Sequence, residues 1–239
     1  TSTPVPGEFE EDPVTSSAAA VQQQPSKTAA QHTEPMLRPA EAGRRQIGFL
    51  ISVHATDVQD AKHIPLFEGS TTLGRIDCDV CFPEDDLLSP NHVRIDVAGG
   101  EVILSAMESR NGTFIRIGSN ESVPLNHNDV FRMGQQLLRY EDLAILPTLF
   151  ETREPDTDHL GSPAGSKAWG RLTQVVTDTL AGSSFLLTGD NVFLGRERGT
   201  FTFPGDRYIS GTHAVLVRAG EVTHLKDVGS SNGTYYKVT

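Results

Sequence analysis

The chain has 239 residues, of which 37% are hydrophobic and 21% charged, and its formal net charge is −11. This length allows one large or two ordinary domains, and the composition is that of a soluble protein with some loose segments. The acidic charge disfavours nonspecific binding to nucleic acids or anionic membranes, because both require a basic surface. A single phosphate can still be bound by one well-placed arginine, since net charge does not describe a specific site.

Residues 1–45 are rich in Pro, Ser, Thr, Ala and Gln and show no apolar periodicity. Such a segment buries too little apolar surface to offset the entropy of ordering the chain, so we predict a disordered tail. From residue 46 onward, short apolar runs such as Phe49–Val53 are separated by Gly, Asp, Asn and Pro. This pattern indicates β-strands, and no stretch shows a helical period with caps. We predict a first domain at 46–147, a linker at 148–167 and a second domain at 168–239.

The chain has only two cysteines, Cys78 and Cys81, so a framework of several disulfides is excluded. Their C-x-x-C spacing would also suit a redox pair or half of a zinc site, but zinc needs four ligands and no second pair exists. We interpret the two as small, half-buried residues on a strand, and we expect no metal and no cofactor.

No apolar run reaches the ~18 residues of a membrane span. Nothing at the start looks like a signal peptide, and a cytoplasmic location is the default. Because the chain starts at Thr1 and not at methionine, we expect a processed product or an excised fragment.

A set of short motifs occurs twice, always 121 positions apart. Five landmarks in one register predict a duplicated domain, since the period is too long for a solenoid repeat. The paired segments are Leu73-Gly74-Arg75 with Leu194-Gly195-Arg196, Phe82-Pro83 with Phe203-Pro204, Ser89 with Ser210, His92 with His213, and Ser109-Arg110-Asn111-Gly112-Thr113 with Ser230-Ser231-Asn232-Gly233-Thr234.

The order Gly-Arg, then Ser-x-x-His, then Ser-x-Asn-Gly-Thr resembles the forkhead-associated family, over about residues 47–146 and again over 168–239. The resemblance implies two all-β sandwiches of about eleven antiparallel strands each, with the motifs in loops at one end. It also implies binding of phosphothreonine peptides, downstream of a Ser/Thr kinase, by loops on a rigid scaffold.

The chemistry of these residues agrees with phosphate recognition. Arg75 and Arg196 would offer planar, bidentate donors to the phosphate, and Gly74 and Gly195 would let the backbone turn tightly. Ser89 and Ser210 would add a hydroxyl donor each. In the resembling family, the asparagine equivalent to Asn111 and Asn232 binds the main chain of the peptide, and the preceding position, here Arg110 or Ser231, can touch the phosphate.

Simpler interpretations apply to some of the same residues. Asn-Gly, with Gly112 or Gly233, is also a strong hairpin signal. His92 and His213 are expected to brace the binding loop by hydrogen bonds and not to perform metal or general-base chemistry. A hydrolase is disfavoured because the G-x-S-x-G motif is absent.

The two copies differ in three places. The first has Ala106 where the second has the acidic Asp227, so we expect a softer turn, and Pro90 removes one backbone donor. The second copy ends five residues after Thr234, whereas the first continues to a strand-like run at 136–140. In the resembling fold the last strand pairs beside the first, so we expect the strand near 172–176 to lack a partner and the second domain to be incomplete.

The sequence therefore predicts a non-enzymatic adaptor that binds phosphothreonine on partner proteins, or on its own linker, where Thr152 and Thr157 lie among acidic residues. Two alternatives stay open. One is a phosphate-independent scaffold, and the other is the targeting region of a larger enzyme.

Overall fold

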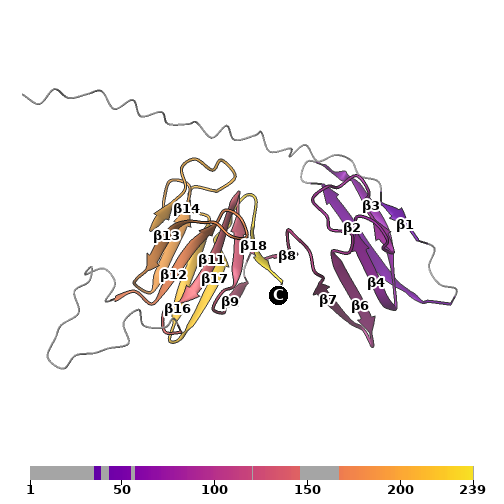
Figure 1. Cartoon of the computed structure of the whole chain (residues 1–239), viewed down its shortest axis with the longest axis horizontal. Coiled ribbons are helices and arrows are strands. Elements are labelled where there is room, and N and C mark those ends of the chain that lie inside the picture. Colours follow the sequence, from indigo (N-terminus) through magenta and orange to yellow (C-terminus); the bar gives the residue numbers. More distant parts are fainter. Residues whose placement is uncertain (1–34, 39–42, 55–56, 120, 146–166, 239) are drawn as a thin grey trace, which may run out of the picture.

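The computed structural model describes residues 35–38, 43–54, 57–119, 121–145 and 167–238. All the secondary-structure elements within these ranges are β-strands. Figure 1 shows these strands gathered into two β-sheet bodies. The predicted all-β class, with antiparallel sandwiches, is confirmed. In the part of the chain that the structure describes, no helix is long and apolar enough to cross a membrane. Most of the predicted tail and linker, with Thr152 and Thr157, lies outside the described residues.

The larger body is a sandwich of two sheets, one of six strands and one of five. The six-stranded sheet has the order β13-β12-β11-β10-β18-β8, and the five-stranded sheet has the order β15-β14-β16-β17-β9. Together they contain the eleven strands that the family resemblance implies. Their bounds are β8 Phe114–Arg116, β9 Ser122–Leu125, β10 Val130–Met133, β11 Gln136–Asp142, β12 Gly170–Val175, β13 Ala181–Leu187, β14 Asn191–Gly195, β15 Phe201–Thr202, β16 Ala214–Ala219, β17 Val222–Asp227 and β18 Thr234–Lys237.

Four strands of this body, β8 to β11, come from the first sequence copy. β11 pairs antiparallel with β12, with Tyr140 opposite Leu172. β10 pairs with β18, and β9 extends the five-stranded sheet beside β17. The strand near 172–176, expected to lack a partner, is therefore paired over most of its length, and that expectation is wrong. The reason is that β9, β10 and β11, from residues 114–142, pair with strands of the second copy in this structure.

The core of this composite body is built from both segments. Side chains from residues 114–142 and from 170–225 pack together, and most are fully buried. A buried hydrogen bond of 2.9 Å between the Tyr140 and Thr223 hydroxyls crosses between the two segments. The fully buried set includes Phe131, Met133, Leu138, Leu172, Leu187, Val192, Leu194, Leu216 and Leu225.

The smaller body, which we call the first unit, contains β1 to β7 (36–106). It has a five-stranded sheet of order β1-β5-β4-β6-β7 and a two-stranded sheet, β2-β3. Its buried cluster is small, with Leu66, Val93, Ile95 and Val97. The bounds are β1 Met36–Leu37, β2 Gln46–His54, β3 Asp57–Phe67, β4 Gly69–Gly74, β5 Val80–Cys81, β6 Val93–Ala98 and β7 Glu101–Ala106.

Strand β1 lies within the segment predicted to be a tail. Met36 pairs with Cys81 and Leu37 with Val80, and the Arg38 amide donates to the Asp79 carbonyl at 2.8 Å. Both β1 side chains are exposed. The short strand is thus held by backbone hydrogen bonds to an otherwise free sheet edge, a kind of contact that the local composition of residues 1–45 does not reveal.

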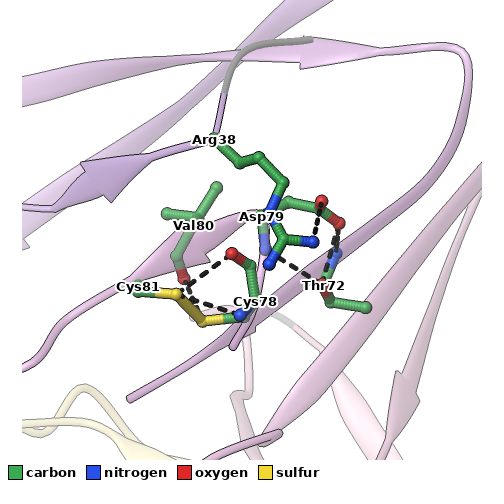
Figure 2. The surroundings of a disulfide bond; sticks show 6 residues. All are labelled: Arg38, Thr72, Cys78, Asp79, Val80 and Cys81. Carbon is green, nitrogen blue, oxygen red and sulfur yellow. Dashed lines mark hydrogen bonds and ion pairs between the residues drawn. A yellow bond between two sulfur atoms is a disulfide. The ribbon is translucent and has the colours of Figure 1, made fainter. Parts of the chain in front are cut away.

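Figure 2 shows that Cys78 and Cys81 are joined by a disulfide in the loop that leads into β5. Their Cα atoms are 5.5 Å apart, a separation that a disulfide can span. The sequence predicts two small, half-buried residues on a strand. Cys81 is half-buried at the end of β5, but Cys78 is buried in the turn before it, and this turn brings the two sulfurs together in a bond that was not expected. Among the described residues, no group of His, Cys, Asp or Glu is arranged to hold a metal ion.

The same loop is also fixed by Asp79, whose carboxylate accepts hydrogen bonds of 2.8 Å from both the backbone amide and the hydroxyl of Thr72 (Figure 2). Partial burial acts to raise the pKa of Asp79, but the hydrogen bonds from Thr72 and the positive charges of Arg38 and Arg44 together leave the pKa lowered. The second copy replaces this pair with Thr200, whose hydroxyl accepts from the Phe193 amide at 3.2 Å.

Candidate functional site

The predicted site residues of each copy lie in three neighbouring loops. In the first unit these are the loops that follow β4, β5 and β7, and in the composite body they follow β14, β15 and β17. Backbone and side-chain hydrogen bonds connect the three loops in both copies, so the structure brings the predicted residues of each set together. The first set is Gly74, Arg75, Ser89, His92, Arg110, Asn111 and Gly112, and the second is Gly195, Arg196, Ser210, His213, Ser231, Asn232 and Gly233.

The arginine of each set is tied to the serine loop through its backbone. The Arg75 amide donates to the Ser89 carbonyl at 2.9 Å, and the Arg196 amide donates to the Ser210 carbonyl at 2.9 Å. The preceding glycines, Gly74 and Gly195, are required for a different reason than the expected tight turn. A Cβ atom at either would collide with the backbone of the serine loop, at the Pro90 or Gly211 carbonyl. Glycine therefore permits close approach of the two loops.

Each histidine hydrogen-bonds both the serine loop and the third loop of its site. In the composite body, the Ser210 amide donates to His213 Nδ1 at 3.0 Å, and His213 Nε2 lies 3.1 Å from the Gly233 carbonyl. Because Nδ1 accepts, the proton of the neutral ring lies on Nε2 and is donated to Gly233. His92 makes the same two contacts, to the Ser89 amide at 3.3 Å and the Gly112 carbonyl at 3.2 Å. Burial lowers the pKa of His213, so the ring is kept neutral.

The serine hydroxyls connect to the third loop. Ser89 Oγ accepts from the Arg110 amide at 3.0 Å, and Ser210 Oγ accepts from the Ser231 amide at 3.1 Å. Each serine uses a lone pair in this contact, so its own hydroxyl proton is available to an acceptor such as a phosphate oxygen. Arg110 and Ser231, which occupy equivalent positions in the two copies, are both exposed.

The asparagines hold the serine loop instead of pointing freely outward. Asn111 Nδ2 donates to the Leu87 carbonyl at 2.7 Å, and Asn232 Nδ2 donates to the Tyr208 carbonyl at 2.8 Å. The following glycines, Gly112 and Gly233, have φ angles of 74° and 84°, a region that favours glycine. The amide oxygen and the second amide proton of each asparagine remain for contact with a bound peptide.

Asp227 organises the third loop of the composite body. Its carboxylate accepts from the Ser230 hydroxyl at 2.6 Å, the Thr234 hydroxyl at 2.7 Å and the Ser230 amide at 2.8 Å. Burial acts to raise the pKa of Asp227, but these hydrogen bonds outweigh it and lower the pKa. In the first unit, Ala106 replaces this carboxylate. The buried hydroxyls of Ser109 and Thr113 have no hydrogen-bond partner there.

The two arginine side chains have different surroundings. Both Nε and Nη2 of Arg196 lie 3.0 Å from Glu197 Oε1, so a carboxylate occupies part of its donor fork. The equivalent neighbour of Arg75 is Ile76, and Arg75 Nε is buried without a hydrogen-bond partner. Sequence reasoning overlooked Glu197, although its place directly after a repeated Gly-Arg is a visible signal.

The comparisons with known proteins agree with this arrangement. The FHA domain family model matches residues 71–134 and 192–238. One curated relative, "Oxoglutarate dehydrogenase inhibitor" of Corynebacterium jeikeium (strain K411), is 36% identical over 90 residues, which are 36% of this chain and 62% of the relative. The chain thus spans less than two thirds of that relative's length. No solved structure matches the chain.

Proposed function

The chain carries two segments of the forkhead-associated (FHA) domain family, and from this premise we propose that it is a phosphothreonine-binding adaptor. In this proposal each three-loop set receives one phosphothreonine of a partner protein that a Ser/Thr kinase has modified. No part of the proposed mechanism involves catalysis, a metal or a cofactor.

The observation that carries the proposal is the same donor arrangement, built twice. In both copies an arginine is held against the serine loop by a 2.9 Å backbone hydrogen bond. In both, the serine hydroxyl accepts a backbone amide and keeps its own proton to donate. A guanidinium and a hydroxyl carried on two loops that are joined in this way would suit a phosphate dianion, because each charge-assisted hydrogen bond contributes roughly 1.5–3 kcal/mol.

Specificity for a peptide, and not for free phosphate, would come from the asparagines and the residues before them. Asn111 and Asn232 are fixed by one amide proton and can offer the rest of the amide to a peptide main chain. Arg110 and Ser231 occupy equivalent exposed positions but differ in charge and length. We therefore expect the two sites to prefer different residues around the phosphothreonine.

The experiment is a binding titration of a fluorescent phosphothreonine peptide library against the intact chain and its Arg75→Ala, Arg196→Ala and doubly substituted variants. Each single substitution should remove one class of binding peptides, and the double substitution should remove both. Arg94→Ala is the control, because that exposed arginine pairs with Asp96 and belongs to neither set of site residues. Binding that survives in the double variant would support a phosphate-independent scaffold instead.

A further inference from the structure

A second arginine of the second copy lies against its serine loop. The Arg198 amide donates to the Gly211 carbonyl at 2.9 Å, next to Ser210. A Cβ atom placed on Gly211 would lie 3.1 Å from Arg198 Nη2 and 3.7 Å from Arg198 Cζ, so the guanidinium covers the position that a side chain at Gly211 would occupy. Arg198 thus adds a cation beside the serine whose hydroxyl the proposed function assigns to the phosphate.

A third arginine is held in the same loop by an aromatic ring. Arg207 Cζ lies 5.3 Å from the centroid of the Tyr208 ring, within the range of a cation–π contact, and Arg207 Nη2 lies 3.4 Å from the Tyr208 hydroxyl. The Tyr208 carbonyl accepts the hydrogen bond from Asn232, the asparagine expected to bind the peptide main chain. Arg207 is therefore held beside the residue that positions this asparagine.

Both guanidinium groups are available to an anion. Arg198 and Arg207 are exposed, and in the part of the chain that the structure describes no carboxylate forms an ion pair with either. The neighbouring carboxylate, Glu197, is paired instead with Arg196 at 3.0 Å. Arg198 and Arg207 can thus offer their donors to a ligand, and the planar fork of a guanidinium suits a carboxylate.

The first site has acidic residues at the same two positions. Asp77 is equivalent to Arg198, and Asp86 is equivalent to Arg207, each 121 positions earlier in the chain. Both aspartates are exposed. The sign of the charge is therefore reversed at two equivalent exposed positions of the two sites.

Two other exposed differences between the copies offset each other in charge. The first copy has Glu84 where the second has Gly205, and it has Arg110 where the second has Ser231. The acidic Glu84 and the basic Arg110 together add no net charge to the first site. They do not cancel the reversal at the other two positions.

We propose that Arg198 and Arg207 form an acid-binding subsite of the second phosphothreonine site, which selects peptides with Asp or Glu close to the phosphothreonine. The first site, with Asp77 and Asp86, selects peptides with Lys or Arg there instead. Opposite charges attract the correct peptide at each site and like charges repel the wrong one, so one chain discriminates between two classes of phosphopeptide. This inference rests on the proposed function and names the ligand class of each site.

Three matched phosphothreonine peptides test this selectivity, with three Glu, three Ala or three Lys residues on each side of the phosphothreonine. Calorimetry on the Arg75→Ala chain reports on the second site, and calorimetry on the Arg196→Ala chain reports on the first. The second site should bind the glutamate peptide more tightly than the lysine peptide by about 3- to 10-fold, and the first site should show the reverse. This range is expected because an exposed attraction and an exposed repulsion, each worth up to about 5-fold, are exchanged.

The net charge of the whole chain makes the second site the stricter test. At −11, the chain as a whole attracts basic peptides, so a preference for acidic peptides has to come from local charges.

Substitutions in the Arg75→Ala chain assign the preference to the two arginines. Arg198→Gln with Arg207→Gln should remove the preference for glutamate, while the affinity for the alanine peptide changes by less than about 2-fold. Arg198→Lys with Arg207→Lys should keep the preference, because the charges remain. The control, Arg45→Gln with Arg94→Gln, removes two exposed arginines that belong to neither set of site residues, and it should leave the preference unchanged.

The matching substitution for the first site is Asp77→Asn with Asp86→Asn in the Arg196→Ala chain. Asparagine is chosen because Asp77 has a φ angle of 59°, a region that asparagine tolerates. This variant should lose most of the preference for the lysine peptide. Glu101→Gln with Glu221→Gln removes the same charge from two other exposed positions and should retain the preference.

The outcomes separate this inference from the proposed function. Phosphopeptide binding with the same flank preference at both sites would overturn the inference and leave the proposed function standing. An equal loss of affinity for all three peptides in the glutamine variant would also overturn it, because the arginines would then contact the phosphate or only hold the loop. Absence of phosphopeptide binding at both sites would refute the proposed function, and this inference with it.

Discussion

Arg171 and Glu141 are joined by two hydrogen bonds, Nε to Oε2 at 2.8 Å and Nη2 to Oε1 at 3.0 Å, across the boundary between the two sequence copies. The Glu141 side chain is only 8% exposed, and the hydrogen bonds from Arg171 lower its pKa. This pair connects the last strand of one copy, β11, to the first strand of the next, β12. It is therefore a sensitive probe of the composite body.

Arg171→Met should destabilise the composite body, because it leaves the Glu141 carboxylate buried without its main donor. Since Arg171 is about one third exposed and the Thr173 hydroxyl remains, we expect a loss of about 1–3 kcal/mol. Urea denaturation, monitored by circular dichroism, measures this loss of stability. Arg94→Met, which breaks an ion pair exposed on both sides, should cost less than ~1 kcal/mol. Equal small effects of the two substitutions would contradict the role given to Arg171.

Asp227→Ala should loosen the third loop of the composite body, because two hydroxyls and two backbone amides lose their acceptor. The expected loss of stability is about 2–4 kcal/mol, since unsatisfied buried groups cost ~1–3 kcal/mol each and water can reach part of the loop. The reverse substitution in the first unit, Ala106→Asp, gives Ser109 and Thr113 an acceptor and should slow amide exchange in residues 107–113. If Ala106→Asp instead speeds exchange there, the equivalence of the two loops is wrong.

Lowering the pH should destabilise the composite body through His213. Burial lowers the pKa of this histidine below its usual value of about 6.5. Between the two pKa values, the unfolded chain binds a proton that the folded chain does not, so stability rises with pH in that window and falls as the solution is acidified below about 6.5. The slope contributed by one group is at most ~1.4 kcal/mol per pH unit.

Denaturation midpoints at pH 7.5 and 5.5 measure this effect. His213→Gln should lower stability at pH 7.5 but reduce the difference between the two pH values, because glutamine does not titrate. A variant that keeps the full difference would show that another group is responsible.

The carboxylate of Glu197 should weaken the second site. It occupies donors of Arg196 that a phosphate would use, and its charge repels a dianion. Glu197→Ile, which copies the residue beside Arg75, should tighten phosphopeptide binding at that site by up to about 5-fold, since one exposed ion pair contributes at most ~1 kcal/mol. Glu197→Gln removes the charge but keeps the shape of the side chain, and it should give part of the gain in phosphopeptide affinity. Calorimetry on chains that also carry Arg75→Ala isolates the second site, and unchanged affinity in both variants would refute the effect.

The repeat predicted most of the site from the sequence, because Gly74, Arg75, Ser89 and His92 recur in register with Gly195, Arg196, Ser210 and His213. Alternating apolar residues and turn formers were enough to predict the β-class. The allocation of β11 was not predictable, because an apolar strand such as 136–140 suits the open edge of either copy. Its partner is chosen by contacts such as Glu141 with Arg171, which only the folded chain reveals. The Cys78–Cys81 bond likewise depends on the turn between them, not on their number.

The most direct test of the account is calorimetric titration of the intact chain with one phosphothreonine peptide, selected by the library titration, and with the same peptide unphosphorylated. We predict saturable binding of the phosphorylated peptide and a loss of at least about 100-fold in affinity without the phosphate, since two charge-assisted hydrogen bonds of roughly 1.5 kcal/mol each are removed. Phosphoserine in place of phosphothreonine should bind more weakly, by about 1 kcal/mol for the lost methyl group. Equal affinity for the phosphorylated and unphosphorylated peptides would contradict the central claim that these two sites read phosphorylation.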